Sequence, residues 1–497
     1  MKILFTIIWM TICTQCLFSQ TYIPIDTANL EIRKQESKLF LSNEKLFYKS
    51  LNSGYSFGER ALIKRKYDSM DKAFNEDILN GQFIFDKRFD RMIDSILTEL
   101  QATNLQIPKD LKFYISRNLP LNATSFGNKI FSINLGSFYF LQNDDQIAAV
   151  ISHEIAHLIL NHTIRNMQHQ YMLNKSSDIR NDIFDIRNEK NNQGEKAYNK
   201  LRNILYEDGR LNKKQELEAD SLGYVIYRKT KFNKGDYVKD LMLSEMYDTL
   251  RPAGLDIQTY KKVFNLPQLP FKEEWLKKED FSNYNYSKFK DRYNEDSINS
   301  HPETVKRIAL LKKTFPELMN TDSLHAATPQ FLKLQQIAKY EQPPSLMIQE
   351  EYGLGVYICL LRIQENDKDE YFTEWLGKFF DKITDARKHY LLNRYLDRLD
   401  PKDQSESYQQ FLNFMWNLNL KELEKITEHY TKKGSLRAFF LVIQFFQTYL
   451  VVFVFFIVFL QHNISFFCLM RIYRVFLLGS QRYSFFRQFP IKYGIYP

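Results

Sequence analysis

Two periods of hydrophobic residues divide the first third of the chain. Most of residues 22–100 has the spacing of amphipathic helices, with apolar residues three or four positions apart. In segment 111–116, Leu111, Phe113 and Ile115 share one face, as in a strand, and segment 129–133 is a second short strand. The pattern therefore predicts an α+β fold that is mainly helical and contains a small sheet.

Two helices are clearly predicted in the middle of the chain. The first begins at Asn143, a residue type whose side chain caps helix N-termini, and its apolar stripe continues to Ile159. The second begins near Asn212 and continues through Tyr227. Residues 163–211 between them are polar and charged, so we expect either a long exposed helix or a mobile insertion there.

The pattern over residues 328–433 is helical throughout. We expect breaks at Pro343-Pro344, Gly353 and Pro401, which leave paired helices of roughly 12–16 residues. Such pairs fit a degenerate helical-repeat array, and they fit a plain helical bundle with no binding role equally well.

The first 19 residues have the pattern of a secretory signal peptide. Lys2 precedes an apolar run of 11 residues, Ile3–Cys13, which is too short to span a bilayer comfortably. We expect cleavage after Ser19. The alternative is a buried N-terminal strand.

A longer apolar segment lies near the other end, at residues 438–460. As a helix, its 23 residues would extend about 34 Å, enough to cross a hydrocarbon core of about 30 Å. The positive-inside rule then places the basic and aromatic tail 461–497 in the cytoplasm. A frameshifted or wrongly assigned end is the alternative, because residues 436–497 hold 14 of the 41 Phe residues and no acidic residue.

The charge gives no argument for nucleic-acid binding, and the cysteine content excludes two kinds of structure. The formal charge is +9, but six basic residues lie in 436–497, so +9 less six leaves only +3 on the rest of the chain. We therefore expect no nucleic-acid partner, because proteins that bind nucleic acid carry a clustered basic face. Between the apolar ends Cys359 is the only cysteine, which excludes a disulfide framework and a cysteine-based zinc finger there.

Candidate chemistry is concentrated in the first of the two clear helices. His153, Glu154 and His157 form an H-E-x-x-H sequence, and residues at positions i and i+4 project from the same helical face. Both imidazoles can therefore reach one zinc ion. Glu154 is placed beside them to accept a proton from the metal-bound water.

A catalytic zinc ion takes three protein ligands and leaves one position for water. The metzincin pattern fails here, because Leu160 and Thr163 stand where it requires Gly and His. Glu216 and Asp220 on the second helix offer another solution, since they also share one helical face. We predict that Glu216 is the third ligand, with Glu218 as the fallback, and that Asp220 bonds the far nitrogen of a ligand histidine.

These motifs resemble those of the HtpX/BepA-type zinc metallopeptidases, the family that includes the CAAX prenyl endopeptidases. The resemblance covers about residues 74–315 and rests on three blocks that occur in order: 121–157, Glu216 to Asp220 as E-x-x-A-D, and Ser300-His301-Pro302 followed by Arg307. It implies a gluzincin-type endopeptidase. We therefore expect an N-terminal helical segment at 20–73, a metallopeptidase domain at 74–320 and the all-helical region after it.

The resemblance also gives His301 a role. It implies that this loop residue approaches the metal, either as a temporary fourth ligand that blocks the water or as a transition-state hydrogen-bond donor. A surface position beside a helix is the alternative. His162 lies five residues after His157, so we expect it to face away from the zinc as a structural residue. Strand 129–133 is a candidate sheet edge that could hold an extended substrate.

Together these expectations describe an exported, membrane-associated endopeptidase with one Zn²⁺ per chain. The resemblance implies misfolded or unassembled envelope proteins as its polypeptide substrates. A competing hypothesis is a non-enzymatic assembly factor or chaperone that works through residues 328–433, although a purely structural zinc site needs no general base such as Glu154. A third hypothesis is a soluble exported peptidase, for which the C-terminal tail has been wrongly assigned to the sequence.

Overall fold

Four short strands form one mixed sheet, in the order β1-β2-β4-β3, in the N-terminal half of the computed structural model. The structure describes residues 22–25, 29–51, 54–188, 193–249, 254–278, 304–320, 325–400 and 404–432. β2 and β4 are parallel, with Phe113 opposite Phe131, and the two outer strands run antiparallel to their neighbours. The strands are β1 (Phe83–Ile84), β2 (Lys112–Ser116), β3 (Ala123–Ser125) and β4 (Ile130–Asn134).

The expectation that strand 129–133 forms a sheet edge is wrong. β4 lies between β2 and β3. Its residues Ile130, Phe131 and Ile133 are at most 3% exposed, as is typical of a central strand that is covered on both faces. Among the described residues, β3 lies at that edge of the sheet instead.

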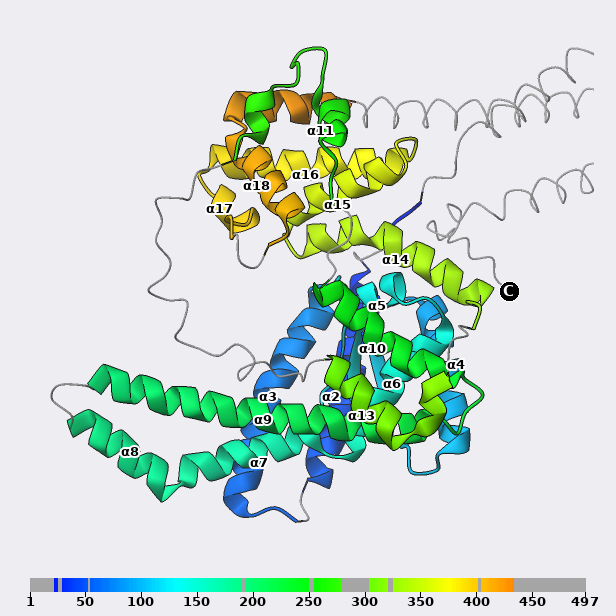
Figure 1. Cartoon of the computed structure of the whole chain (residues 1–497), viewed down its shortest axis with the longest axis vertical. Coiled ribbons are helices and arrows are strands. Elements are labelled where there is room, and N and C mark those ends of the chain that lie inside the picture. The colour runs from blue at the N-terminus through cyan, green and yellow to red at the C-terminus, as the bar shows by residue number, and fades with distance from the viewer. Residues whose placement is uncertain are drawn as a thin grey trace, which may run out of the picture. The chain divides into compact units, whose positions relative to one another are not determined.

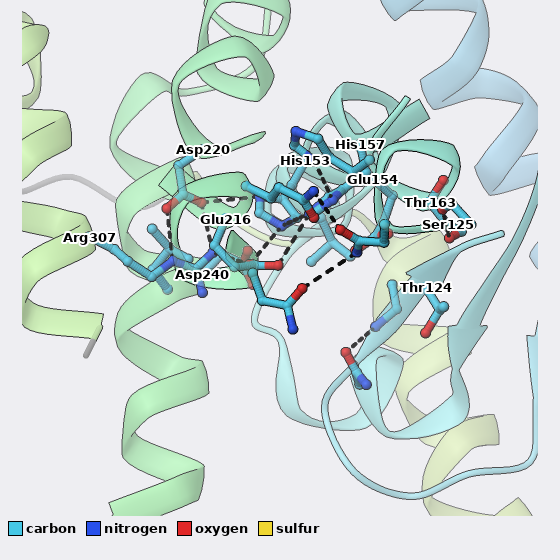
Figure 2. Close-up of a pocket in the computed structure, with 18 of the residues that line it drawn as sticks. Thr124, Ser125, His153, Glu154, His157, Thr163, Glu216, Asp220, Asp240 and Arg307 are labelled. Atoms are coloured by element: carbon cyan, nitrogen blue, oxygen red, sulfur yellow. Dashed lines mark hydrogen bonds and ion pairs between the residues drawn. The ribbon is translucent and has the colours of Figure 1, made fainter. Parts of the chain in front are cut away.

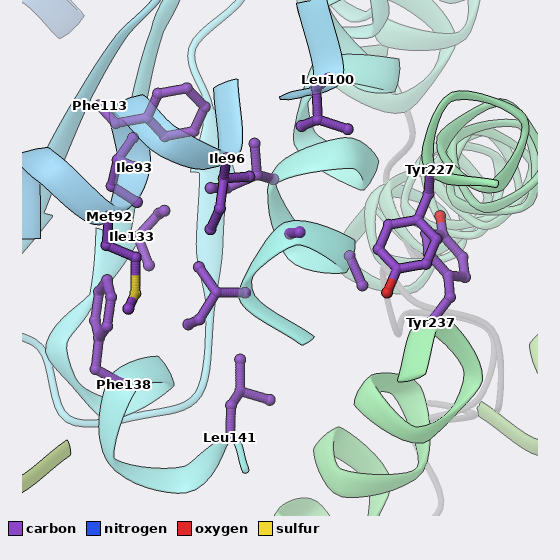
Figure 3. Close-up of a cluster of buried hydrophobic side chains, with 14 of the residues drawn as sticks. Met92, Ile93, Ile96, Leu100, Phe113, Ile133, Phe138, Leu141, Tyr227 and Tyr237 are labelled. Carbon is purple, nitrogen blue, oxygen red and sulfur yellow. The ribbon is translucent and has the colours of Figure 1, made fainter. Parts of the chain in front are cut away.

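Helices cover this sheet and share one hydrophobic core with it. Figure 3 shows Met92, Ile93 and Ile96 of α4 in one cluster with Phe113 and Ile133 of the sheet. This core continues through α6 to α9 and α10. The helices up to residue 249 are α2 (Leu30–Ser50), α3 (Phe57–Leu79), α4 (Lys87–Thr103), α5 (Leu135–Phe140), α6 (Asp144–Ile159), α7 (His162–Lys175), α8 (Ser177–Asn188), α9 (Gln193–Tyr227) and α10 (Lys234–Thr249).

The helix that carries H-E-x-x-H, α6, is largely buried. Asn143 caps it as predicted, because its side-chain oxygen accepts a hydrogen bond from the Gln146 amide at 2.9 Å. Ile147, Ile151 and Ile155 have no exposed surface. Their packing in the core fixes the rotation of α6 about its axis, and therefore the direction of its polar side chains.

The polar stretch after α6 is helical in its described residues apart from Ser176. Asn161 has a φ of 55°, in the left-handed region that ends helices, so α7 begins after a bend of 42° from α6. α7, α8 and the first part of α9 make up residues 162–211, apart from Ser176 and from 189–192, which are not described. α9 therefore begins at Gln193 rather than near Asn212. Figure 1 shows α8 beside α9.

The region after residue 328 is helical, as predicted, and has a second hydrophobic core that also includes α11 and η1. The break expected at Pro343-Pro344 is wrong, because α14 continues through both. Pro344 has no amide hydrogen for the carbonyl of Tyr340, and the Tyr371 hydroxyl donates to that carbonyl at 2.8 Å instead. The elements are α11 (Ile257–Phe264), η1 (Glu273–Leu276), α13 (Thr304–Thr314), η3 (Pro316–Asn320), α14 (Pro329–Ile348), α15 (Tyr352–Glu365), α16 (Glu370–Lys388), α17 (Leu392–Tyr395), α18 (Glu406–Asn417) and a helix over 420–432.

Several predictions concern residues outside the described ranges. These are the signal peptide 1–19, the apolar segment 438–460, the tail 461–497, His301 and Pro401. Within the described part of the chain, no single helix has the length and apolar character to cross a membrane. α6 and α7, which are bent relative to each other, have the required length and apolar character only when the two helices are taken together.

Candidate active site

A cavity of about 560 Å³ opens where α3, β3, α6, α7, α9, α10 and α13 meet. Figure 2 shows that its walls bring side chains of α6 and α9 close to Arg307 of α13, with the edge strand β3 nearby. Three segments that lie far apart in the sequence thus meet in one cavity. The predicted site residues that line it are His153, Glu154, His157, Glu216 and Asp220.

His153, His157 and Glu216 place three potential metal-binding atoms together. The two Nε2 atoms are 3.0 Å apart, and each lies 3.4 Å from one oxygen of the Glu216 carboxylate. One donor atom from each residue lies within 4.8 Å of the other two. Two imidazole nitrogens and a carboxylate oxygen are a ligand set that catalytic zinc ions take. The residues present therefore fit a zinc ion.

Close packing of α6 against α9 brings Glu216 to the two histidines, and Gly223 permits this approach. A Cβ atom at position 223 would lie 3.0 Å from Cα of His153 and 2.4 Å from the hydroxyl oxygen of Tyr237. The contact with the Tyr237 hydroxyl is too short for a Cβ atom unless something shifts, and the contact with the His153 backbone is tight enough that the two helices would have to move apart slightly. The glycine three residues after Asp220 therefore sets the spacing of the two helices.

Asp220 lies beside the far nitrogen of His153. Its Oδ1 atom is 3.1 Å from Nδ1 of His153, and Arg307 donates two hydrogen bonds to the same carboxylate. The guanidinium of Arg307 is also 3.4 Å from Glu216. Burial alone would raise the pKa of Asp220, but Arg307 and His153 outweigh burial and hold that pKa below its usual value. Asp220 is therefore a buried carboxylate with cations on two sides.

The two imidazoles of the cluster differ in their affinity for a proton. Burial lowers the pKa of both. At His153 the carboxylates of Asp220 and Glu216 outweigh burial and raise the pKa to about 10, whereas at His157 the neighbouring His153 adds to burial and lowers it to about 3. Without a metal ion the pair therefore favours one positive charge at neutral pH, on His153, and a metal ion that binds there has to displace the extra proton.

Two further carboxyl groups line the same cavity. Glu154 is 8% exposed and follows His153 directly on α6. Asp240 of α10 is 7% exposed, and burial raises its pKa to about 7 although His153 and Arg307 act in the opposite direction. Asp240 belongs to no motif, so no sequence pattern points to it, and only the packing of α10 against α6 brings it here.

His162 contacts the far nitrogen of His157, so the expectation that it faces away is wrong. The Nδ1 atoms of the two rings are 2.9 Å apart. Nε2 of His162 is 3.2 Å from the Glu218 carboxylate, which also accepts a hydrogen bond from Arg165 at 2.8 Å. The expectation assumed one continuous helix, but the bend at Asn161 turns His162 back toward α6. Glu218, the fallback ligand, contacts His162 in this arrangement.

Comparison with known proteins agrees with this arrangement. The sequence matches the Peptidase family M48 over residues 87–315, which contain the cluster and Arg307. A similar protein of Vibrio cholerae serotype O1, named beta-barrel assembly-enhancing protease, is 29% identical to this chain over 91 residues. That similarity spans 18% of this chain and 19% of the Vibrio protein. Residues 87–315 of this chain therefore form a domain of the Peptidase family M48.

Proposed function

We propose that this chain is a zinc-dependent endopeptidase of the cell envelope, with His153, His157 and Glu216 as metal ligands. The observation that carries the proposal is the grouping of these three donors, within 4.8 Å, in a cavity that also contains Glu154. A metal site that only stabilises a fold needs no carboxyl group beside it. Glu154 therefore favours catalysis over a purely structural role.

The chemistry of peptide hydrolysis divides between the metal and Glu154. When bound, zinc polarises the scissile carbonyl and lowers the pKa of its water to about 7. Glu154 takes a proton from the attacking water and passes it to the leaving amine. Asp220 holds the ring of His153 at its far nitrogen, and Arg307 keeps Asp220 charged. His301 remains a proposed switch or transition-state residue.

The edge strand β3 is the proposed docking site for the substrate backbone. The carbonyl of Asn122 and the amide of Phe126 bond to β4. Because backbone groups alternate in direction along a strand, those of Ala123 and Ser125 face away from the sheet. Residues 121–125 line the cavity. The Ala123 amide already donates to the Asn122 side chain at 2.9 Å, and the Ser125 carbonyl accepts from the Thr163 hydroxyl at 3.4 Å. An extended peptide can pair with the Ala123 carbonyl and the Ser125 amide and pass beside the three ligands.

The envelope location rests on two supports. The expected signal peptide directs the chain out of the cytoplasm, and the similar Vibrio cholerae protein is named for enhancing β-barrel assembly. We therefore propose misfolded or unassembled envelope proteins as substrates and a role in their quality control or processing. Anchoring by residues 438–460 remains part of the proposal. A non-enzymatic assembly factor is the second candidate, because the helical region has a hydrophobic core of its own.

Metal analysis of the purified protein tests the ligand assignment. We expect about one zinc per chain, and we expect His153→Ala and His157→Ala to lose it, because two remaining ligands retain zinc poorly. His169→Ala is the matched control, since His169 lies on α7 and pairs with Asp208 at 3.4 Å. Full zinc occupancy in both ligand variants, or no zinc in the wild type, would contradict the proposal.

A further inference from the structure

The far nitrogens of the two histidines in the cluster have different partners. Nδ1 of His153 lies beside the carboxylate of Asp220, whereas Nδ1 of His157 lies beside the imidazole ring of His162. Metal-ligating histidines usually donate their second ring N–H to an acceptor that fixes the tautomer and the ring orientation. A histidine can serve as that acceptor only if its facing nitrogen carries no proton. The contact between His157 and His162 therefore constrains the protons on both rings.

Only one arrangement of protons allows His157 to bind a metal through the nitrogen that faces the cluster. Nε2 of His157 lies 3.4 Å from Glu216, so this nitrogen must be free of a proton and Nδ1 must carry it. The Nδ1 atom of His162, 2.9 Å away, must then accept, which places the proton of His162 on Nε2. That N–H points to the Glu218 carboxylate at 3.2 Å.

We propose that His162 is a positioning residue that holds His157 in its metal-binding tautomer, with Glu218 fixing the tautomer of His162 in turn. This proposal rests on the proposed function, because it takes His157 to be a zinc ligand. Arg165 holds Glu218 by a hydrogen bond of 2.8 Å, and both residues are partly exposed, so the chain of contacts runs from the cluster to the surface.

The bend between α6 and α7 is what builds this contact. Asn161, with its φ of 55°, ends α6 and starts α7 in a new direction. His162 is the first residue of α7 and is only 2% exposed, so it sits in the angle between the two helices. A buried histidine in that position needs partners for both ring nitrogens, and His157 and Glu218 supply them.

The test compares His162→Asn with His162→Leu. Asn and Leu have nearly the same shape, but only Asn keeps an acceptor at the position of Nδ1. Both variants lose the ring and the contact with Glu218. A difference between them in zinc dissociation constant, measured by competition with a chelator, therefore isolates the acceptor. His169→Leu, on the same helix, controls for loss of a histidine away from the cluster. Melting temperatures without zinc report any general loss of stability.

We expect His162→Leu to bind zinc about 10–100-fold more weakly than the wild type, with His162→Asn far closer to it. The melting temperatures of the two variants without zinc should be similar. Equal zinc dissociation constants for His162→Asn and His162→Leu would overturn the proposal. A wild-type protein that binds no zinc would instead overturn the proposed function, so the two failures are distinguishable.

A second pair of variants keeps the test decisive if the substitutions at the buried His162 prevent folding. The Glu218 side chain is 29% exposed and tolerates replacement more easily. Glu218→Gln keeps an oxygen acceptor for Nε2–H of His162, whereas Glu218→Leu removes it. We expect zinc binding to weaken by up to about tenfold in Glu218→Leu and to stay near the wild type in Glu218→Gln. Identical zinc binding in both would contradict the role given to Glu218.

Discussion

Arg307 donates two hydrogen bonds to Asp220, from Nε at 2.8 Å and from Nη2 at 2.7 Å. Asp220 is 1% exposed and lies between Arg307 and His153. The contact therefore joins three helices, α13, α9 and α6, behind the ligand cluster. Residues that are nearly 90 positions apart in the sequence thus act as one electrostatic unit.

Removing Arg307 should destabilise the protein strongly. In Arg307→Leu, the carboxylate of Asp220 loses its main partner while it stays buried, which costs about 3–5 kcal/mol in the free energy of unfolding. Arg228→Leu is the matched control, because Arg228 pairs with Glu317 at the surface and its loss should cost under about 1 kcal/mol. Urea unfolding without zinc measures both. Similar losses in the two variants would contradict this account of Asp220.

A methyl group at Gly223 should separate α6 from α9. Gly223→Ala places a Cβ atom against the backbone of His153, and such overpacking typically costs about 1–3 kcal/mol. Zinc binding should also weaken, because Glu216 moves away from the histidines with α9. Adding Tyr237→Phe removes the clash with the hydroxyl and should recover part of the stability. Unchanged thermal stability and zinc affinity in Gly223→Ala would show that the helices are not so closely packed.

Two proline substitutions in β3 should separate substrate binding from folding. The amide of Ser125 faces away from the sheet, so Ser125→Pro should raise KM for peptide hydrolysis with little loss of stability. The amide of Thr124, opposite Ser132, faces β4, so Thr124→Pro should destabilise the sheet itself. Peptidase kinetics and thermal unfolding of both variants measure this. Normal KM in a folded Ser125→Pro variant would exclude pairing of the substrate at that amide.

The contribution of Glu44 to stability should become less favourable as the pH rises from about 4.3 toward 9. Burial, followed by the neighbouring Asp71, raises the pKa of Glu44 to about 9, whereas an unfolded Glu titrates near 4.3. Between these values the folded protein retains a proton that the unfolded chain releases, so each step to higher pH favours unfolding. Asn128 donates to this carboxyl at 2.8 Å.

Glu44→Gln mimics the protonated side chain and removes this dependence. The variant should be more stable than the wild type at pH 8 by at least about 1 kcal/mol, with near-equal stability at pH 4. Urea unfolding at the two pH values measures the difference. A variant that is less stable than the wild type at pH 8 would show that Glu44 is charged in the folded protein.

Local patterns predicted the helices well, because helical periodicity and capping act within a few residues. Asn143 and the apolar stripe of α6 are examples. Local patterns failed where contacts between distant residues determine the secondary structure. β3 has only three residues and no apolar alternation, so its place at the sheet edge depends on β4. Pro343 and Pro344 stay within α14 because a distant residue, Tyr371, satisfies a helix carbonyl.

Sequence patterns also identified only part of the candidate site. His153, Glu154 and Glu216 belong to motifs whose spacing places them on helical faces, so the sequence sufficed to select them. The position of His162 was predicted wrongly, because the spacing of residues along a helix gives their direction only within that helix. Asn161 ends α6 before His162. Asp240 carries no local signal at all. Its place in the cavity depends on the packing of α10, which no short pattern encodes.

Cleavage of casein by Glu154→Gln shows whether Glu154 acts as the general base of a zinc peptidase. The amide cannot accept the proton of the attacking water, so we predict a loss of activity of about 10²–10⁴-fold. The zinc content and melting temperature should stay at wild-type values, because Glu154 is not a proposed ligand. Wild-type cleavage by the zinc-loaded Glu154→Gln protein would contradict the account.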